Sequence, residues 1–181
     1  MIIVFSGLHG TGKSTIAKRI AETLGYKYYS TGVIFREMAK ERGMTLEQFS
    51  RFAEGNYDID KELDNRILEF AKTNENYVFD GQMPAYLLGP LANLRILLEC
   101  EDTIRIERMR LRDGRDFAAQ KHETLMREES ERQRFIEIYH IDVHDPDLIR
   151  KTYDLILDVS HLNIEEVYNR CFTFIKQKIA K

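Results

Sequence analysis

A phosphate-binding motif stands near the start of the chain. Residues 7–14 read Gly-Leu-His-Gly-Thr-Gly-Lys-Ser, a glycine and four free positions before Gly-Lys-Ser. Glycines let the backbone curl until several N–H groups point at one anion. Lys13 can reach the outer phosphates of a nucleoside triphosphate, and the Ser14 hydroxyl can ligate magnesium. The expected triphosphate-binding residues are Gly7, Gly10, Thr11, Gly12, Lys13, Ser14 and Thr15.

The segments on either side of the motif fit a strand–loop–helix unit. Residues 2–5 are an apolar run of buried-strand length, and residues 15–24 have helical periodicity that stops before Gly25. The N-terminus of that helix adds partial positive charge at the phosphates. A glycine-rich turn with a solvated lysine is the alternative, and the order of the flanking elements favours the triphosphate site.

An aspartate-glycine pair, Asp80-Gly81, follows the apolar segment 77–79. A carboxylate at the end of a strand beside a phosphate loop can hold magnesium, directly or through water. The alternative is a strand-ending Asp-Gly turn, which is common by itself. Because the phosphate loop is present, we expect Ser14 and Asp80 to form the magnesium site.

Arginines cluster in two segments. Positions 105, 108, 110, 112 and 115 are all arginine, and Arg105, Arg108 and Arg112 fall on one helical face. In the second segment Arg127, Glu131 and Arg134 share a face by the same spacing. A solvated helix surface with salt bridges is the competing interpretation. Phosphoryl transfer needs cations around the developing charge and needs water excluded, so we interpret the two segments as parts of a lid.

A second phosphate site is suggested by Arg36, which follows the polar residues Ser30 and Thr31 at the end of a short apolar segment. At a strand end the Arg36 guanidinium could hold the phosphate of a second nucleotide. The five histidines show no metal-binding spacing, and His9 is expected to be a side chain at the tip of the phosphate loop.

Composition limits the remaining possibilities. The chain has 181 residues, 43% of them hydrophobic, and a net charge of −3. This length fits one domain with a sizeable core. The absence of a global positive charge argues against nucleic acid or an anionic membrane as partner. The strand that begins at Ile2 leaves no room for a targeting peptide, and two distant cysteines fit a reducing compartment. We therefore expect a cytoplasmic protein, and a monomer.

The elements that position these residues alternate between short apolar segments and helical patterns. We expect strands at 2–5, 26–29, 77–79, 94–99 and 153–157, and helices at 15–24, 33–42, 46–54, 59–72, 103–112, 116–139 and 164–178. Residues 142–147 are expected to be a loop. This alternation predicts an α/β fold in which helices cover both faces of a parallel sheet. Ligands bind at the carboxyl ends of such strands, where the phosphate loop, Ser30, Thr31 and Asp80 should converge.

Beyond the phosphate loop, four further segments are distinctive. They are Ser30-Thr31-Gly32-Val33-Ile34-Phe35-Arg36, Ile59-Asp60-Lys61-Glu62-Leu63-Asp64, Arg127-Glu128-Glu129-Ser130-Glu131-Arg132 and Ile138-Tyr139-His140-Ile141-Asp142. With them the sequence resembles the nucleoside monophosphate kinases over nearly its whole length, most closely the archaeal type of cytidylate kinase. The resemblance implies a P-loop NTPase fold of five parallel strands, in a single kinase domain over residues 1–181. It also implies an acceptor-binding insertion at 31–73 and a short lid at 109–123.

The resemblance assigns roles to individual residues. Lys13 and the loop amides would hold the phosphates of ATP, and Arg108 and Arg112 would lie near its base and phosphates. Arg36 would grip the acceptor phosphate. The residues implied to act on the transferring group are Lys13, Arg108, Arg112, Arg127 and Arg134. The residues implied to contact the acceptor are Ser30, Thr31, Arg36, Asp80, Gln82 and Glu131.

One position departs from the family pattern. An arginine is expected two residues after the strand-ending acid, and the chain has Gln82 there. Glutamine offers one acceptor and one donor group without charge, so it can match a cytosine or a uracil edge. Our hypothesis is that Gln82 faces the acceptor base and that more than one pyrimidine monophosphate is accepted. The alternative is a polar loop residue outside the site.

The sequence thus predicts magnesium-dependent transfer of the γ-phosphoryl group of ATP to a nucleoside monophosphate, with CMP or dCMP as first choice. UMP, AMP or a non-nucleotide metabolite is the alternative acceptor. An accessory ATPase or nucleotide-driven switch is the alternative of another class. The guanine-reading Asn-Lys-x-Asp element of GTPase switches is absent from the sequence, which favours transfer over switching.

Overall fold

A parallel sheet forms the centre of the computed structural model, which describes residues 1–54, 56–73 and 76–179. Within these ranges the sheet has five strands in the order β2-β3-β1-β4-β5. The strands are β1 (Ile2–Ser6), β2 (Lys27–Ser30), β3 (Tyr77–Asp80), β4 (Leu94–Glu99) and β5 (Leu155–Asp158). The parallel five-stranded sheet predicted from the alternating pattern is therefore confirmed.

The register of the sheet brings the polar strand ends to one edge. Phe5 of β1 lies opposite Asp80 of β3, and Asp80 lies opposite Ser30 of β2. On the other side of β1, Ser6 lies opposite Leu97 of β4. Every residue of β1 and β3 is buried, as expected for strands covered on both faces. The loop after β1, Ser30 and Asp80 therefore meet at the carboxyl edge.

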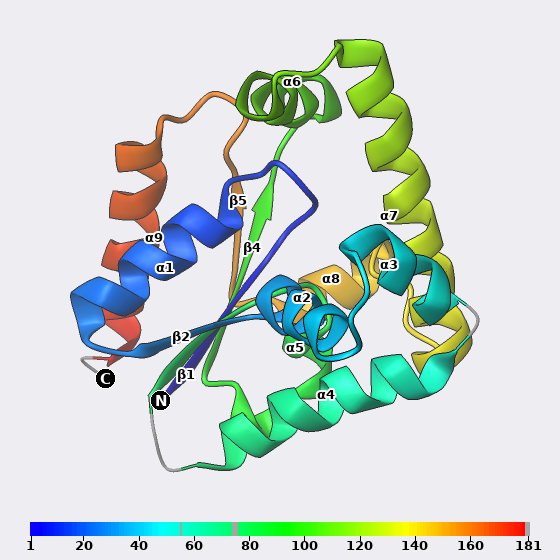
Figure 1. The fold of residues 1–181 in the computed structure, drawn as a ribbon. Helices are drawn as coiled ribbons and strands as arrows, with labels where there is room; N and C mark the ends of the chain where they lie inside the picture. Colours follow the sequence, from blue (N-terminus) through cyan, green and yellow to red (C-terminus); the bar gives the residue numbers. More distant parts are fainter. Residues whose placement is uncertain (55, 74–75, 180–181) are drawn as a thin grey trace.

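One face of the sheet is covered by α1 (Lys13–Leu24) and α9 (Ile164–Ile179) (Figure 1). Their apolar stripes join the sheet in one buried cluster that includes Phe5, Ile16, Ile96 and Cys171. Burial of such side chains contributes about 1.5–3 kcal/mol each relative to exposure. This packing fixes the direction in which α1 leaves the phosphate loop.

The opposite face carries α2 (Thr31–Glu41), α3 (Leu46–Glu54), α4 (Tyr57–Lys72) and α5 (Pro84–Leu87). Ile34, Phe49 and Ile67 from the first three of these helices pack with Val4 and Phe79 of the sheet. Thr45 and Gln48 exchange backbone-to-side-chain hydrogen bonds of 2.9 and 3.2 Å at the start of α3, a capping box. The interval predicted to bind the acceptor is therefore a helical layer against the sheet.

Two helices at the carboxyl edge meet at a short elbow. The first helix, α6 (Asp102–Asp113), ends at Gly114 with φ of 66°, and the second, α7 (Phe117–Tyr139), begins after Asp116. The Asp116 side chain accepts from the Ala119 N–H at 3.1 Å and so caps α7. In Figure 1, α7 descends from the end of α6 toward α3 and α4. The Asp-Gly break predicted between two arginine-rich helices is confirmed.

Two segments differ from the sequence prediction. Residues 146–152 form the helix α8 (Pro146–Thr152), whose first two residues were expected to lie in a loop at 142–147 and whose other residues had no predicted element. Asp145 caps this helix through the Asp147 and Leu148 N–H groups, and Pro146 occupies its first turn. The last strand begins at Leu155 instead of Tyr153, because Tyr153 is the C-cap of α8. A further short stretch, η1 (Gly89–Leu91), precedes β4.

No helix in the described part of the chain is both long enough and apolar enough to cross a lipid bilayer.

The loop after β1 provides a test of the fold. A Cβ atom at Gly10 would overlap the Arg105 carbonyl oxygen, whereas one at Gly12 would have no atom within 4 Å. Both glycines have left-handed φ values, 82° and 90°, which cost an alanine about 1–2 kcal/mol. We expect Gly10→Ala to lower the free energy of unfolding, measured in urea without ligand, by at least about 1 kcal/mol more than Gly12→Ala. Equal losses in the two variants would contradict the close packing of the loop on α6.

Candidate active site

The phosphate loop has the shape of an anion cradle at the N-terminus of α1. Its glycines take left-handed or otherwise restricted φ values, 148° at Gly7, 82° at Gly10 and 90° at Gly12. The Thr11 hydroxyl donates to the Leu8 carbonyl at 3.0 Å and fixes the turn. Ser14 and Thr15 at the start of α1 are exposed. Exposed N–H groups at a helix N-terminus are the ordinary partners of a phosphate group.

Lys13 lies half-buried between the loop and two acidic side chains. Its ammonium group is 3.5 Å from the Leu8 carbonyl oxygen. Burial lowers the pKa of Lys13, and the carboxylates of Asp80 and Glu131 oppose that shift. The cation is thus held at the loop by acids from β3 and α7, where it can meet the phosphates of a bound nucleotide.

Asp80 is buried, and one of its oxygens is free to bind a ligand. Its Oδ2 accepts the Tyr28 hydroxyl at 2.8 Å, whereas Oδ1 has no hydrogen-bond partner among the described residues. Burial and the Asp80 carboxylate raise the pKa of Tyr28, and the hydroxyls of Ser14 and Ser30 oppose that rise. Ser14 and Asp80, the two predicted magnesium ligands, are therefore neighbours around Tyr28.

An Mg²⁺ ion fits this arrangement. An unpaired buried carboxylate oxygen costs free energy that a cation would recover, and Mg²⁺ prefers oxygen ligands. Over residues 1–54, 56–73 and 76–179, no group of three or more His, Cys, Asp or Glu side chains could hold a metal by itself. This suits an ion that is bound by one carboxylate together with substrate phosphates.

The second predicted phosphate site lies at the end of β2. The Thr31 hydroxyl donates to the Asp80 carbonyl at 3.2 Å, which ties the start of α2 to β3. The exposed Arg36 guanidinium lies near Gly32, 3.6 Å from the position of a built Cβ. No ion pair of Arg36 occurs within the described residues. The structure thus leaves one arginine at this edge without a carboxylate partner.

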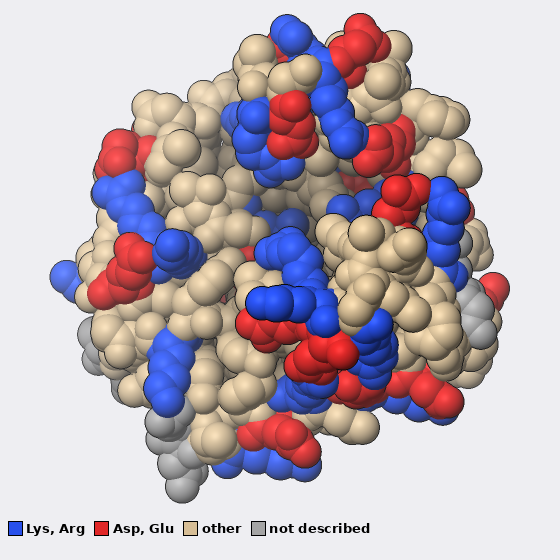
Figure 2. Space-filling model, viewed as in Figure 1, with Lys and Arg blue, Asp and Glu red and all other residues tan. Residues whose placement is uncertain are grey.

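Glu131 and Arg127, two of the three residues predicted to share a face of α7, lie next to the phosphate loop. Arg127 Nε donates to Glu131 Oε1 at 2.9 Å, and the same oxygen lies 3.7 Å from His9 Nε2. Farther along, Arg134 Nε is 4.0 Å from Asp60 Oδ1, which is too long for a hydrogen bond. In the space-filling view, Lys and Arg side chains border a hollow between α6 and α2 (Figure 2).

The three arginines predicted to share a face of α6 have separate environments. Arg108 donates from Nη2 to the carbonyls of Val159 and Ser160 at 2.9 and 3.2 Å and so holds the loop after β5. Arg112 is exposed and pairs with its neighbour Asp113 at 2.7 Å. Arg105 is only 1% exposed and points into the protein, so it does not share a solvent-facing surface with Arg112. Its partner is the buried Glu128 on α7, at 2.7 Å.

A carboxylate cluster between α4 and α7 was not predicted. Asp60 and Asp64 are 6% and 7% exposed, and the Tyr139 hydroxyl donates to Asp64 Oδ2. Burial raises the pKa of Asp64 to about 6, and burial likewise raises the pKa of Asp60. A signal was present, since two aspartates four residues apart occupy one face of an amphipathic helix. Their partners on α7 could not be read from that spacing.

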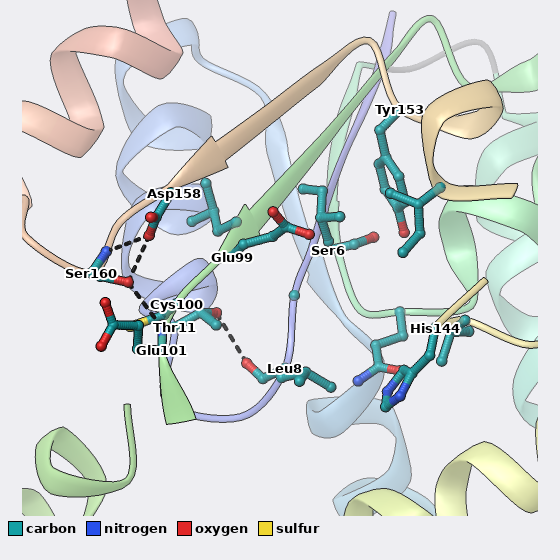
Figure 3. A pocket seen from close by; sticks show the side chains of 16 residues that line it. Ser6, Leu8, Thr11, Glu99, Cys100, Glu101, His144, Tyr153, Asp158 and Ser160 are labelled. Atoms are coloured by element: carbon teal, nitrogen blue, oxygen red, sulfur yellow. Dashed lines mark hydrogen bonds between the residues drawn. The ribbon is translucent and has the colours of Figure 1, made fainter. Parts of the chain in front are cut away.

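Gln82 lies in a cavity of about 410 Å³ at the ends of β1, β4 and β5. Ser6, Leu8, His144 and Tyr153 also line this cavity (Figure 3). Ser30, Thr31 and Arg36 are not among the residues that line it. The Thr31 side chain nevertheless lies close to Gly81, the neighbour of Gln82, and the role of Gln82 in base recognition stays a prediction.

Comparisons with known proteins match this architecture. A family model described as an AAA domain matches residues 3–135. A cytidylate kinase of Methanosphaera stadtmanae is 41% identical over 169 residues, 93% of this chain and 94% of that protein. A cytidylate kinase of Desulfurococcus amylolyticus is 40% identical over 167 residues, 92% of this chain and 88% of that protein.

Solved structures share the fold at low sequence identity. An uncharacterised protein from Eubacterium ventriosum has a TM-score of 0.74 and 18% identity, over 97% of this chain and 98% of that chain. A shikimate kinase from Bacteroides thetaiotaomicron has a TM-score of 0.63 and 14% identity, over the same shares of the two chains.

The raised pKa of Asp64 predicts a pH dependence of stability. The folded protein binds the Asp64 proton more tightly than the unfolded chain does. The contribution of Asp64 to the free energy of unfolding should therefore be fully present below about pH 4 and be lost as the pH rises through about 6. Asp64→Asn keeps an oxygen for Tyr139 and removes this loss, which amounts to at most about 3 kcal/mol. Urea unfolding at pH 4.5 and pH 8 measures it.

The exposed Asp58 on the same helix is the matched control. Asp58→Asn should leave the difference between the two pH values as in the wild type. If Asp64→Asn also leaves that difference unchanged, the Asp64 carboxyl is not protonated in the folded protein.

Proposed function

The chain belongs to the cytidylate kinases, a family of ATP-dependent nucleoside monophosphate kinases, and we propose that it transfers the γ-phosphoryl group of ATP to CMP or dCMP. The relatives named cytidylate kinase match more than nine-tenths of this chain at about 40% identity. The products would be ADP and the corresponding diphosphate. The proposal describes a monomeric, cytoplasmic enzyme that requires Mg²⁺.

The observation that carries the proposal is the pair of phosphate-binding sets on either side of Asp80. The loop with Lys13 lies on the β1 side, and Ser30, Thr31 and the unpaired Arg36 lie on the β2 side. Two phosphate-bearing substrates can then face each other across one buried carboxylate. This arrangement suits transfer between two nucleotides better than hydrolysis of one.

On the donor side, we assign the β- and γ-phosphates to the loop N–H groups and Lys13. Ser14 and the free Oδ1 of Asp80 would hold the magnesium ion, which supplies positive charge to the phosphate oxygens when bound. Arg108 fixes the loop after β5, where the donor base would rest. These residues bind and orient ATP, and none of them has to form a covalent bond to the phosphoryl group.

On the acceptor side, Arg36 would hold the acceptor phosphate. Arg127 and Arg134 would approach the transferring group from α7, and Glu131 would orient Arg127 through their ion pair. An oxygen of the acceptor phosphate then attacks the γ-phosphorus in line with the leaving oxygen, and ADP leaves. Catalysis on this scheme consists of positioning and charge stabilisation.

The exposed Arg112 and residues 109–123 would close over the donor. Arg112 pairs with its own sequence neighbour, so its guanidinium can exchange Asp113 for a phosphate without breaking a buried contact. Closure keeps water away from the γ-phosphoryl group and so favours the acceptor over hydrolysis.

The direct test is ADP formation from ATP with a panel of acceptors. We expect CMP and dCMP to be used with the highest kcat/KM and UMP and AMP with lower values. Lys13→Ala should reduce kcat by about 10² or more, because the cation serves the transition state most. Lys18→Ala, an exposed lysine on the same helix, should leave kcat unchanged. Activity on AMP or on a non-nucleotide alcohol alone would overturn the acceptor assignment.

A second test separates the two phosphate sites. Arg36→Met should raise KM for CMP by about tenfold or more and leave KM for ATP near the wild-type value, because Arg36 would contact only the acceptor phosphate. Arg51→Met removes an exposed arginine of the same helical layer and should change neither constant. A rise in KM for ATP instead would place Arg36 at the donor.

A further inference from the structure

A buried ion pair joins the two arginine-rich helices. Arg105 of α6 is 1% exposed and Glu128 of α7 is 6% exposed. Two parallel hydrogen bonds connect them, from Nη1 to Oε1 at 2.7 Å and from Nη2 to Oε2 at 2.9 Å. Asp102 accepts from Nε and Nη2 at 2.8 and 2.6 Å. With the bond from Nη1 to the His9 carbonyl at 3.1 Å, all five guanidinium N–H groups have acceptors.

The same pair forms hydrogen bonds with the phosphate loop at His9. The Glu128 Oε1 atom accepts the His9 main-chain N–H at 3.0 Å and lies 3.1 Å from its Nδ1. Arg105 binds the carbonyl oxygen of the same residue. Both backbone polar groups of His9 are therefore held by side chains from other elements. His9 was expected to be a side chain at the tip of the phosphate loop, and its contacts with α6 and α7 could not be predicted from the sequence.

These contacts fix the position of the phosphate loop along α7, the helix that carries the proposed acceptor contacts. Glu128 directly follows Arg127 in α7, and Glu131 lies one turn farther and reaches His9 Nε2 at 3.7 Å. The loop after β1 also turns closely below α6 (Figure 1), where Gly10 packs on the Arg105 carbonyl. A shift of α7 along its axis would thus move His9 and Arg127 together.

Stability alone does not account for this pair. Two well-packed apolar side chains of similar volume would stabilise the fold as well as a buried ion pair, or better, because no charges would be desolvated. Burial raises the pKa of Glu128, yet the hydrogen bonds from His9 and Arg105 leave it below its ordinary value, so the carboxylate is charged. What an apolar pair cannot do is bind the N–H and the carbonyl of His9.

We propose that Glu128 and Arg105 are positioning residues that hold the His9 peptide groups and so keep the phosphate loop in register with α7 during phosphoryl transfer. The proposal rests on the kinase function proposed above. Neither residue needs to touch a nucleotide. Their effect is on the alignment of Lys13, Arg127 and the γ-phosphoryl group.

Paired substitutions separate positioning from stability. Arg105→Met or Glu128→Leu alone leaves an unpaired buried charge and should lower the unfolding midpoint strongly. The double variant R105M/E128L should recover most of the midpoint but lower kcat for CMP by about tenfold or more, because the His9 N–H has no acceptor. R105M/E128Q keeps a neutral oxygen for that N–H and should regain at least about fivefold in kcat over R105M/E128L. Thermal melts accompany every assay.

Each outcome decides the proposal. Equal kcat values for R105M/E128L and R105M/E128Q, or a wild-type kcat in R105M/E128L, would show that the pair is structural only. If R105M/E128L does not fold, R105M/E128Q replaces it: a kcat lowered beyond that of the control pair R132M/D142L supports the positioning role, and a wild-type kcat at a lowered midpoint shows that the pair is structural only.

The half-buried pair Arg132–Asp142 is the matched control, because it also joins α7 through two hydrogen bonds, of 2.9 and 2.7 Å. R132M/D142L should leave kcat as in the wild type. Titration with a fluorescent ATP analogue, without acceptor, measures the affinity of the phosphate loop for the nucleotide independently of turnover. Weaker binding by R105M/E128L than by R105M/E128Q would support the positioning role even if the wild type used none of the tested acceptors. Inactivity of the wild type would count against the proposed function alone.

Discussion

The central position of β1 is the constraint on which the rest of the molecule depends. Its five residues are buried between β3 and β4, so neither its direction nor its register can change without disrupting the core. The strand delivers the chain to the phosphate loop at one edge and sets Asp80 opposite Phe5. Every distance in the cleft, from Lys13 to the free oxygen of Asp80, follows from that register.

The cations of the cleft differ in how firmly they are held. Arg105 is locked by three acceptor groups, and Arg127 and Arg112 each pair with a carboxylate that is near in sequence. Arg36 has no ion pair in the described structure. A phosphate that binds Arg127 or Arg112 must compete with the carboxylate that already pairs with that arginine. This compensation reduces repulsion among the arginines at the cost of some affinity for each phosphate.

The sequence predicted features that neighbouring residues determine, and it did not predict contacts between segments that are distant in the chain. The phosphate loop, the five strands and Asp80 follow from short patterns, because the flanking residues impose their conformation. Helical spacing correctly grouped residues on a face of α6, but it could not show that Arg105 turns inward to a carboxylate 23 positions later. The role of Gln82 stays a prediction, since a loop position does not fix the direction of its side chain. The Asp145-Pro146 cap of α8 was a local signal that was present in the sequence but not used.

The turn at residues 114–116 lets the N-terminal part of α7 move relative to the two points at which the helix is held. Glu128 holds this helix part-way along its length through its hydrogen bonds with Arg105. Tyr139 holds it near its end through its hydrogen bond to Asp64. The stretch from Phe117 to Glu128 is eleven residues, about 17 Å, and it buries Gln120 and Thr124. A bend of about ten degrees at Glu128 then moves the turn by about 3 Å. If residues 109–123 close as proposed, the position of a single buried carboxylate along α7 limits how far they can travel.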